Sequence, residues 1–193
     1  MFNKSCKRFV FIIIIVAMFL MNSLYSDDYK QLREQGKSVL LTHYHDILKS
    51  FAGSYRQIFF FTPPDARPEN GSGSSVNTII LDERFLEINS KLKMGKDILQ
   101  RKTVIGYDGI AEKYTLTQYS NYETFPMTAT GKFDPDEKSI VFRGNYPYEA
   151  LNAASFMIVL KYDNHEEFTY TFYEIEDEVE SKILEIKNFK ISE

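Results

Sequence analysis

The chain has 193 residues, a length sufficient for one domain with a substantial hydrophobic core. It carries 23 basic and 27 acidic residues with no basic block, and this balance argues against a nucleic-acid-binding protein. Sixteen Phe and thirteen Tyr make it rich in aromatic residues, as strand-rich chains tend to be.

Residues 1–26 have the layout of a secretory signal peptide. Lys4, Lys7 and Arg8 precede a run of thirteen apolar residues, and the polar stretch after this run ends at the small residue Ser26. A membrane-spanning helix needs about 20 apolar residues, so the run is short for a membrane anchor. An uncleaved anchor is the alternative, and both interpretations place the rest of the chain outside the cytoplasm. The signal peptide predicts a secreted or periplasmic protein.

Cleavage after Ser26 would give a mature chain that begins at Asp27. That chain would have 20 basic and 27 acidic residues, a net charge of −7, and no thiol, because the only cysteine is Cys6. Disulfides, cysteine nucleophiles and cysteine-ligated metals are therefore excluded from it. We also expect no stable membrane span in the mature chain and no nucleic-acid partner.

A helical pattern precedes the main domain. Apolar residues recur there at three- and four-residue spacings, namely Leu32, Val39, Leu40, Tyr44, Ile47, Leu48 and Phe51. Gly36 is expected to break this helix into two pieces, and the second piece ends at Gly53. We assign residues 27–42 to an N-terminal helical extension and residues 43–190 to a β-barrel domain.

Beyond Gly53 the hydrophobic period drops to two, which indicates β-strands. About ten strand-like runs follow, at 54–62, 75–81, 84–94, 98–106, 112–121, 126–133, 138–145, 153–162, 166–175 and 180–190. Most connections are short and polar; the longer ones are 63–74, rich in Pro, Gly and Ser, and 146–153, which resembles a short helical turn. No helix-length pattern separates the strands, so parallel βαβ units are not expected.

These runs predict an all-β fold, a roughly ten-stranded antiparallel up-and-down barrel with an N-terminal helix covering one end. Closing the barrel protects the two sheet edges directly, and a flattened sandwich is the alternative. The side chains predicted to face inward include Leu86, Ile88, Leu92, Phe156, Ile158, Leu160, Phe168, Tyr170 and Phe172. The interior is then either filled by side chains or open as a ligand cavity.

The run 98–106 predicts a cation on the inner face of the barrel. Either Arg101 and Thr103 point inward or Lys102 does, and the next strand presents either Gln118 or Tyr119. An unpaired buried cation is costly, and a bound carboxylate or an internal acid could offset that cost. A β-bulge or strand end that turns the cation to water is the alternative. The hypothetical interior ligand-binding residues are Arg101, Thr103, Gln118, Tyr119 and Tyr170.

No set of residues predicts catalysis. His45 could be a general base, but helical spacing places it beside Leu48 and Phe51, which favours a structural role. With Gly53 and Tyr55 these residues are predicted to form a plug at one barrel end. The three histidines do not make a zinc site, no Gly-x-Ser-x-Gly occurs, and the acids at 174–180 are interpreted as a solvated turn. We therefore predict no enzyme activity, no metal and no cofactor.

Several segments resemble the motifs of one family in order and spacing. They are "HDILKSFAGSY" at 45–55, "LDERFLE" at 81–87, "IGYDGIAEKY" at 105–114, "GKFDPDEKSIVFRG" at 131–144, "DNHEEFTYTFYE" at 163–174 and "SKILEIKNFK" at 181–190. The family is the uncharacterised bacterial one catalogued as domain of unknown function fifteen seventy-nine. The resemblance covers roughly residues 43 to 190 and implies a lipocalin or calycin barrel, without an established activity. Tyr55 and Lys190 stand where this family usually has Trp and Arg.

The sequence thus predicts an exported small barrel that binds a small apolar or amphipathic, possibly anionic, ligand. A structural or partner-binding envelope protein with a filled barrel is the alternative. The volume of the interior distinguishes the two, because ligand pockets usually measure about 300 Å³ or more.

Overall fold

The computed structural model describes residues 40–64, 67–146 and 155–191. The proposed signal peptide, nearly all of the 27–42 extension and most of the segment 146–153 lie outside the described residues. Within the described ranges, no helix is both long enough and apolar enough to cross a membrane.

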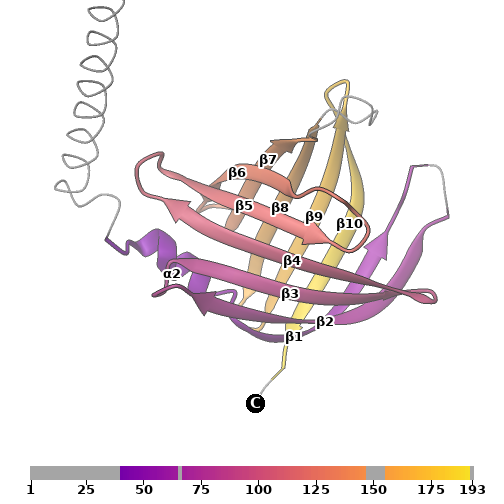
Figure 1. Ribbon diagram of the computed structural model, residues 1–193, viewed down its shortest axis with the longest axis horizontal. Helices are drawn as coiled ribbons and strands as arrows, with labels where there is room; N and C mark the ends of the chain where they lie inside the picture. Colours follow the sequence, from indigo (N-terminus) through magenta and orange to yellow (C-terminus); the bar gives the residue numbers. More distant parts are fainter. Residues whose placement is uncertain (1–39, 65–66, 147–154, 192–193) are drawn as a thin grey trace, which may run out of the picture. The chain divides into compact units, whose positions relative to one another are not determined.

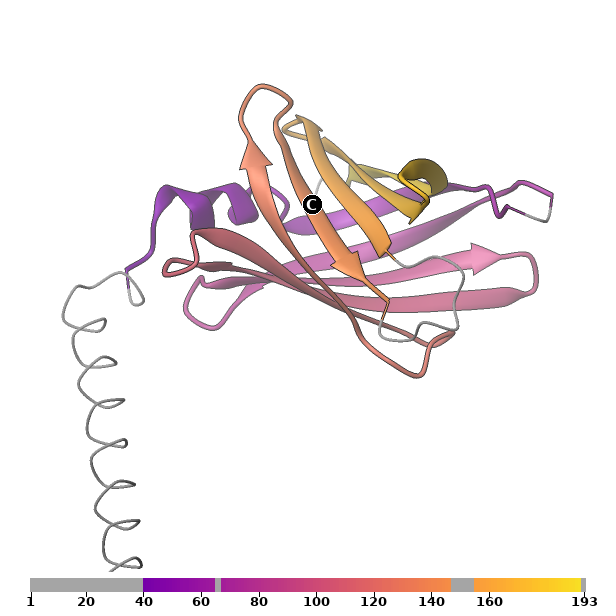
Figure 2. The ribbon, with the colours of Figure 1, turned by 90° about the horizontal axis from the view of Figure 1, so that it is seen from above.

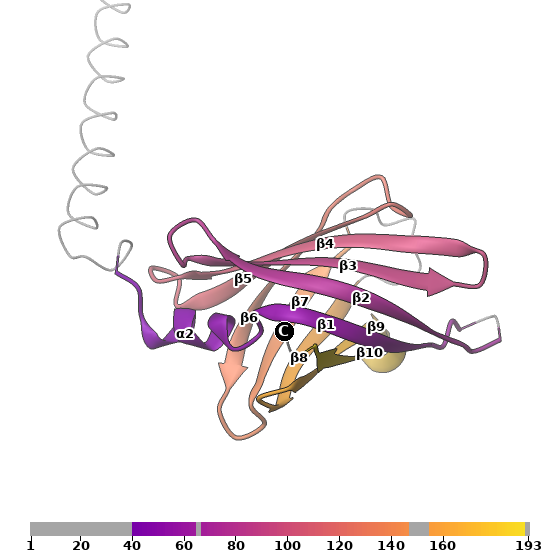
Figure 3. The same cartoon turned by 90° about the horizontal axis from the view of Figure 1, so that it is seen from below.

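One short helix precedes ten antiparallel strands along the chain, and the strands form a closed barrel (Figure 1). The helix is α2 (His43–Lys49), and the strands are β1 (Gly53–Phe61), β2 (Glu69–Ile80), β3 (Phe85–Met94), β4 (Asp97–Asp108), β5 (Lys113–Ser120), β6 (Met127–Asp134), β7 (Ser139–Asn145), β8 (Ser155–Asn164), β9 (Glu167–Glu176) and β10 (Val179–Lys190). Each strand pairs with the next, and β1 lies between β2 and β10, which closes the ring (Figure 3). The predicted up-and-down barrel is confirmed, and the sandwich alternative is wrong.

The barrel has two different ends (Figure 2). The helix α2 lies at the end where β1 begins and β10 finishes, and the β1–β2 and β3–β4 connections lie at the opposite end. Leu48 and Phe51 are each 1% exposed, and Phe51 packs edge-on against Phe168 at 5.3 Å between ring centroids. Tyr55 also packs edge-on against Phe168, at 4.9 Å, so the α2 end is filled by side chains.

Gly53 joins the helix to β1 in a conformation that other residues rarely adopt. Its φ is +137°, and a Cβ at this position would lie 2.8 Å from Cε of Lys190. Lys190 lies directly opposite Tyr55 in the β1–β10 ladder, so the stem of the lysine crosses the start of β1. The glycine allows this close approach and the sharp change of chain direction.

The strand β2 begins earlier than the sequence predicts. Residues 69–74 were expected to be loop because the segment is rich in glycine and serine, yet they pair with β1, and residues 72–74 also pair with β3. A Cβ at Gly71 would lie 2.6 Å from the ring of Phe59, and one at Gly73 would lie 2.7 Å from Leu92. Because these glycines have no side chain, the ring of Phe59 and the side chain of Leu92 can pack against them. This tertiary packing overrides the low strand propensity of glycine.

The predicted inner face is confirmed. Eight of its nine members are buried, and Phe172 is half-buried. The residues 5% exposed or less are Leu86, Ile88, Leu92, Phe156, Ile158, Leu160, Phe168 and Tyr170. Phe172 retains exposure because it faces the end of the barrel opposite α2.

Candidate functional site

A cavity of about 760 Å³ opens at the barrel end opposite α2. Its apolar lining includes Phe61, Met94, Leu99, Met127, Phe172 and Leu184. Its polar lining includes Arg101, Gln118, Glu123, Tyr146, Tyr170 and Glu174. A mostly apolar chamber with a few convergent polar groups is the usual form of a small-molecule site.

Arg101 is the buried cation of this cavity. Regular β3–β4 pairing, with Ser90 opposite Arg101, directs its side chain inward, and the residue is 7% exposed. Its guanidinium carbon lies 4.0 Å from the centroid of the Tyr170 ring, a distance typical of a cation–π contact. Among the described residues, its Nε has no hydrogen-bond partner, and none of the ion pairs involves it.

Tyr170 is held in place from its hydroxyl end. Its O–H donates to Oε1 of Gln118 at 3.1 Å, and the hydroxyl of Thr103 donates to the same oxygen at 3.2 Å. Burial raises the pKa of Tyr170, so the phenol stays neutral. The hydrogen bonds fix the ring as a platform on which the guanidinium of Arg101 rests.

An acidic side of the cavity was missed by the sequence analysis. The Tyr146 hydroxyl donates to Oε1 of Glu174 at 3.5 Å, and burial raises the pKa of the Glu174 carboxyl. The interpretation of Glu174 as part of a solvated turn is wrong, because it shares the inner face of β9 with Tyr170 and Phe172 and is half-buried. Oε2 of Glu123 is buried without a hydrogen-bond partner among the described residues.

The structure settles which alternate residues face inward on β4 and β5. Arg101, Thr103 and Gln118 are buried, whereas Lys102 points outward and pairs with Glu87 at 2.9 Å. The prediction that Tyr119 lies in the interior is wrong: it is 51% exposed and lies opposite Lys102. Once Gln118 faces inward, the two-residue period of a strand forces its neighbour outward.

A buried polar layer lies next to the cavity residues. Gln57 donates to Oδ1 of Asn188 at 2.8 Å and accepts from the hydroxyl of Ser90 at 2.7 Å. Asn188 in turn donates to the backbone carbonyl of Phe168 at 3.2 Å. Because these groups satisfy one another, the layer closes the middle of the barrel without requiring a ligand.

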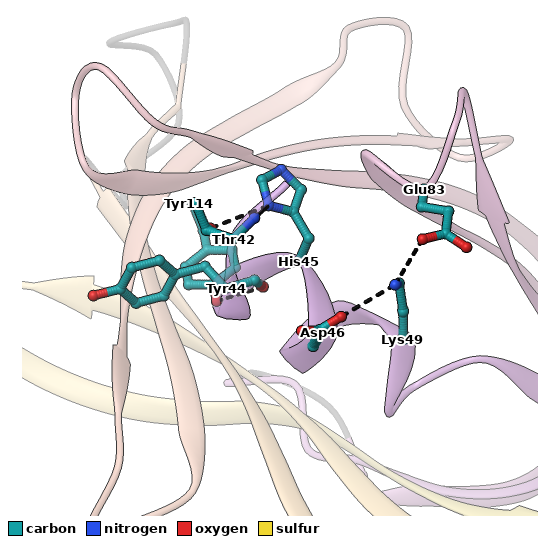
Figure 4. Close-up of polar contacts among 7 residues, drawn as sticks. All are labelled: Thr42, Tyr44, His45, Asp46, Lys49, Glu83 and Tyr114. Atoms are coloured by element: carbon teal, nitrogen blue, oxygen red, sulfur yellow. Dashed lines mark hydrogen bonds and ion pairs between the residues drawn. The ribbon is translucent and has the colours of Figure 1, made fainter. Parts of the chain in front are cut away.

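The contacts of His45 support the predicted structural plug (Figure 4). The backbone N–H of Thr42 donates to Nδ1 of His45 at 3.0 Å, which caps the start of α2. Tyr114 donates from its hydroxyl to the carbonyl of Tyr44 at 2.9 Å, which ties α2 to β5. Lys49 pairs with Glu83 at 2.7 Å on the outer side. Burial lowers the pKa of His45, in keeping with a neutral ring that accepts this hydrogen bond.

The model of the family described as "Protein of unknown function (DUF1579)" matches residues 41–189. The chain belongs to this family. No curated protein matches the sequence. The chain thus shares its family with proteins to which that description gives no function.

Two of the solved structures that match this chain illustrate the shared fold. One is the crystal structure of Rv2717c from M. tuberculosis, with a TM-score of 0.60, 12% identity, and coverage of 79% of this chain and 100% of that one. The other is the S-type phycobiliprotein lyase CPES from Guillardia theta, with a TM-score of 0.58, 9% identity, and coverage of 83% and 98%. At these identities the likeness shows the calycin-like barrel alone.

Proposed function

We propose that this member of the family binds a small amphipathic molecule in the cavity opposite α2. The observation that carries the proposal is a cavity of about 760 Å³ whose buried Arg101 lacks a partner at Nε among the described residues. The volume exceeds the roughly 300 Å³ that distinguishes a ligand pocket from a filled interior. The apolar lining would take a hydrocarbon part, and the guanidinium edge would bond an acceptor group.

Binding accounts for the site better than catalysis. Arg101, Gln118 and Tyr170 form contacts suited to holding and orienting a molecule. The lyase among the structural neighbours makes catalysis a distinct outcome of the test, seen as chemical change of a bound molecule. A partner-binding role with no ligand is the other outcome.

We further propose that the protein acts outside the cytoplasm, after removal of residues 1–26. The cationic segment, the short apolar run and the small residue Ser26 support this proposal. N-terminal sequencing of the exported protein should give a start at or near Asp27. An intact Met1 on membrane-bound protein would instead support an uncleaved anchor.

Two measurements test the binding proposal. Native mass spectrometry of the protein purified from its own host should show a retained small molecule. A fluorescent anionic amphiphile, 11-(dansylamino)undecanoic acid, should bind the purified protein, and Arg101→Met should weaken it about tenfold or more, since hydrogen bonds to charged groups contribute about 1.5–3 kcal/mol.

The neighbouring cation provides a matched control. Lys102→Met removes the same charge one residue away, on the outer face of the same strand, and should change probe affinity less than about twofold. Absence of both a retained molecule and probe binding would contradict the proposal and favour the partner-binding alternative. Equal losses in the two variants would place the probe on the outer surface.

A further inference from the structure

The carboxylate of Glu123 lines the same cavity as Arg101 and lies in the connection between β5 and β6, which hydrogen bonds anchor to β4. Asn121 forms three hydrogen bonds with the first residues of β4. Its N–H donates to the carbonyl of Gln100 at 3.1 Å, and its Oδ1 accepts from the N–H of Gln100 at 2.8 Å. Its Nδ2 donates to the carbonyl of Ile98 at 2.9 Å. Glu123 follows two residues later and lines the same cavity as Arg101.

The cavity therefore holds two unsatisfied polar atoms of opposite kind. Nε of Arg101 is a buried donor, Oε2 of Glu123 is a buried acceptor, and neither has a hydrogen-bond partner among the described residues. Both side chains act electrostatically on Tyr170: the Arg101 charge lowers the pKa of this phenol and the Glu123 charge raises it, beneath the larger effect of burial. Leaving either atom unpaired next to a ligand is costly.

A simple anion satisfies only half of this arrangement. A carboxylate could accept from Arg101, but it would bring a second negative charge toward Glu123, with Glu174 farther along the wall. A simple ammonium could donate to Glu123, but it would bring a second positive charge toward Arg101. A polar group that carries an acceptor and a donor side by side satisfies both atoms and leaves the cavity charge unchanged.

We propose that the ligand of this cavity ends in a polar group with adjacent acceptor and donor, such as a carboxamide or a zwitterion, which accepts from Arg101 and donates to Glu123. This proposal rests on the proposed function and assigns Glu123 as its second anchor. The rest of the ligand has an apolar part, because Phe61, Met94, Leu99 and Met127 are among the residues that line the remaining wall.

Three compounds of equal chain length test the proposal at pH 7 by displacement of the dansyl probe: octanamide, octanoate and octylamine. The wild-type protein should bind octanamide about tenfold more tightly than octanoate or octylamine, since each buried unpaired group costs about 1–3 kcal/mol. Glu123→Gln should raise the affinity for octanoate about tenfold and so reverse part of this order. Arg101→Met should raise the affinity for octylamine relative to the affinity for octanoate.

The control is Glu166→Gln, which removes one negative charge in the exposed β8–β9 turn, at the α2 end of the barrel. It should leave the wild-type order unchanged. A wild-type preference for octanoate, or a preference that Glu123→Gln does not alter, would overturn the assignment of Glu123 even though the cavity binds ligands. If none of the compounds and no probe binds, the proposed function itself fails. The wild-type order is decisive even if a variant does not fold.

Discussion

Replacing Arg101 by Met is expected to stabilise the ligand-free protein. Burying an ion without a charged partner costs several kcal/mol, and a desolvated cation–π contact like that with Tyr170 returns about 2 kcal/mol. Water in the open cavity reduces the cost, so we expect a net gain of about 1–3 kcal/mol for Met, which fills similar space. At about 2–4 °C per kcal/mol for a domain of this size, the melting temperature should rise by about 2–12 °C.

The assay is urea unfolding followed by far-ultraviolet circular dichroism, with thermal melts as a second measurement. Lys102→Met is the matched control, because Lys102 lies in an exposed pair with Glu87 and its loss should cost at most about 1 kcal/mol. A fall in stability for Arg101→Met larger than that of the control would refute the reasoning. Such a fall would mean that Arg101 stabilises the ligand-free fold.

Three further predictions concern the α2 end and the packed interior of the barrel. Gly53→Ala should destabilise the protein by about 1–3 kcal/mol in urea unfolding, because φ is +137° and Lys190 lies where the methyl group would go; an unchanged midpoint would contradict this. Ile158→Ala, at a fully buried site, should lower the free energy of unfolding by about 2–5 kcal/mol. Lys91→Ala, at an exposed site, should change it little, and equal losses in the two variants would contradict the assigned register. Because burial lowers the folded-state pKa of His45 below 6.5, the stability from its neutral ring is present above pH 6.5 and is lost as pH falls through the folded-state pKa. His45→Gln should flatten the stability profile in that window, and a profile identical to wild type would exclude this histidine as the cause.

The barrel could be predicted from the sequence because its signals are local and repeated. Alternation such as that of Leu86, Ile88 and Leu92 identifies both a strand and its dry face. The start of β2 could not be predicted in this way, since Gly71 and Gly73 read as loop residues until Phe59 and Leu92 are seen to occupy their empty side. That contact joins different strands, and no short-range pattern contains it.

The site could be predicted only in part. The sequence indicated that one cation of β4 would face inward, but alternation alone could not choose between Arg101 and Lys102 or between Gln118 and Tyr119. Strand pairing made that choice. Glu123 gave no signal, because it lies in a connection between strands, two residues after Asn121, whose hydrogen bonds hold that connection against β4.

The pairing of β1 with β10 has a consequence for how the protein is made. All other neighbours in the ring are consecutive along the chain, so their hairpins can form as each strand is synthesised. The first strand keeps one row of backbone donors and acceptors exposed until the last strand arrives, as does β9. Loss of residues 179–190 would leave both rows permanently open to pairing with other chains. A truncated product should therefore aggregate rather than remain as a nine-stranded barrel, and a nascent chain needs protection until its final strand is available.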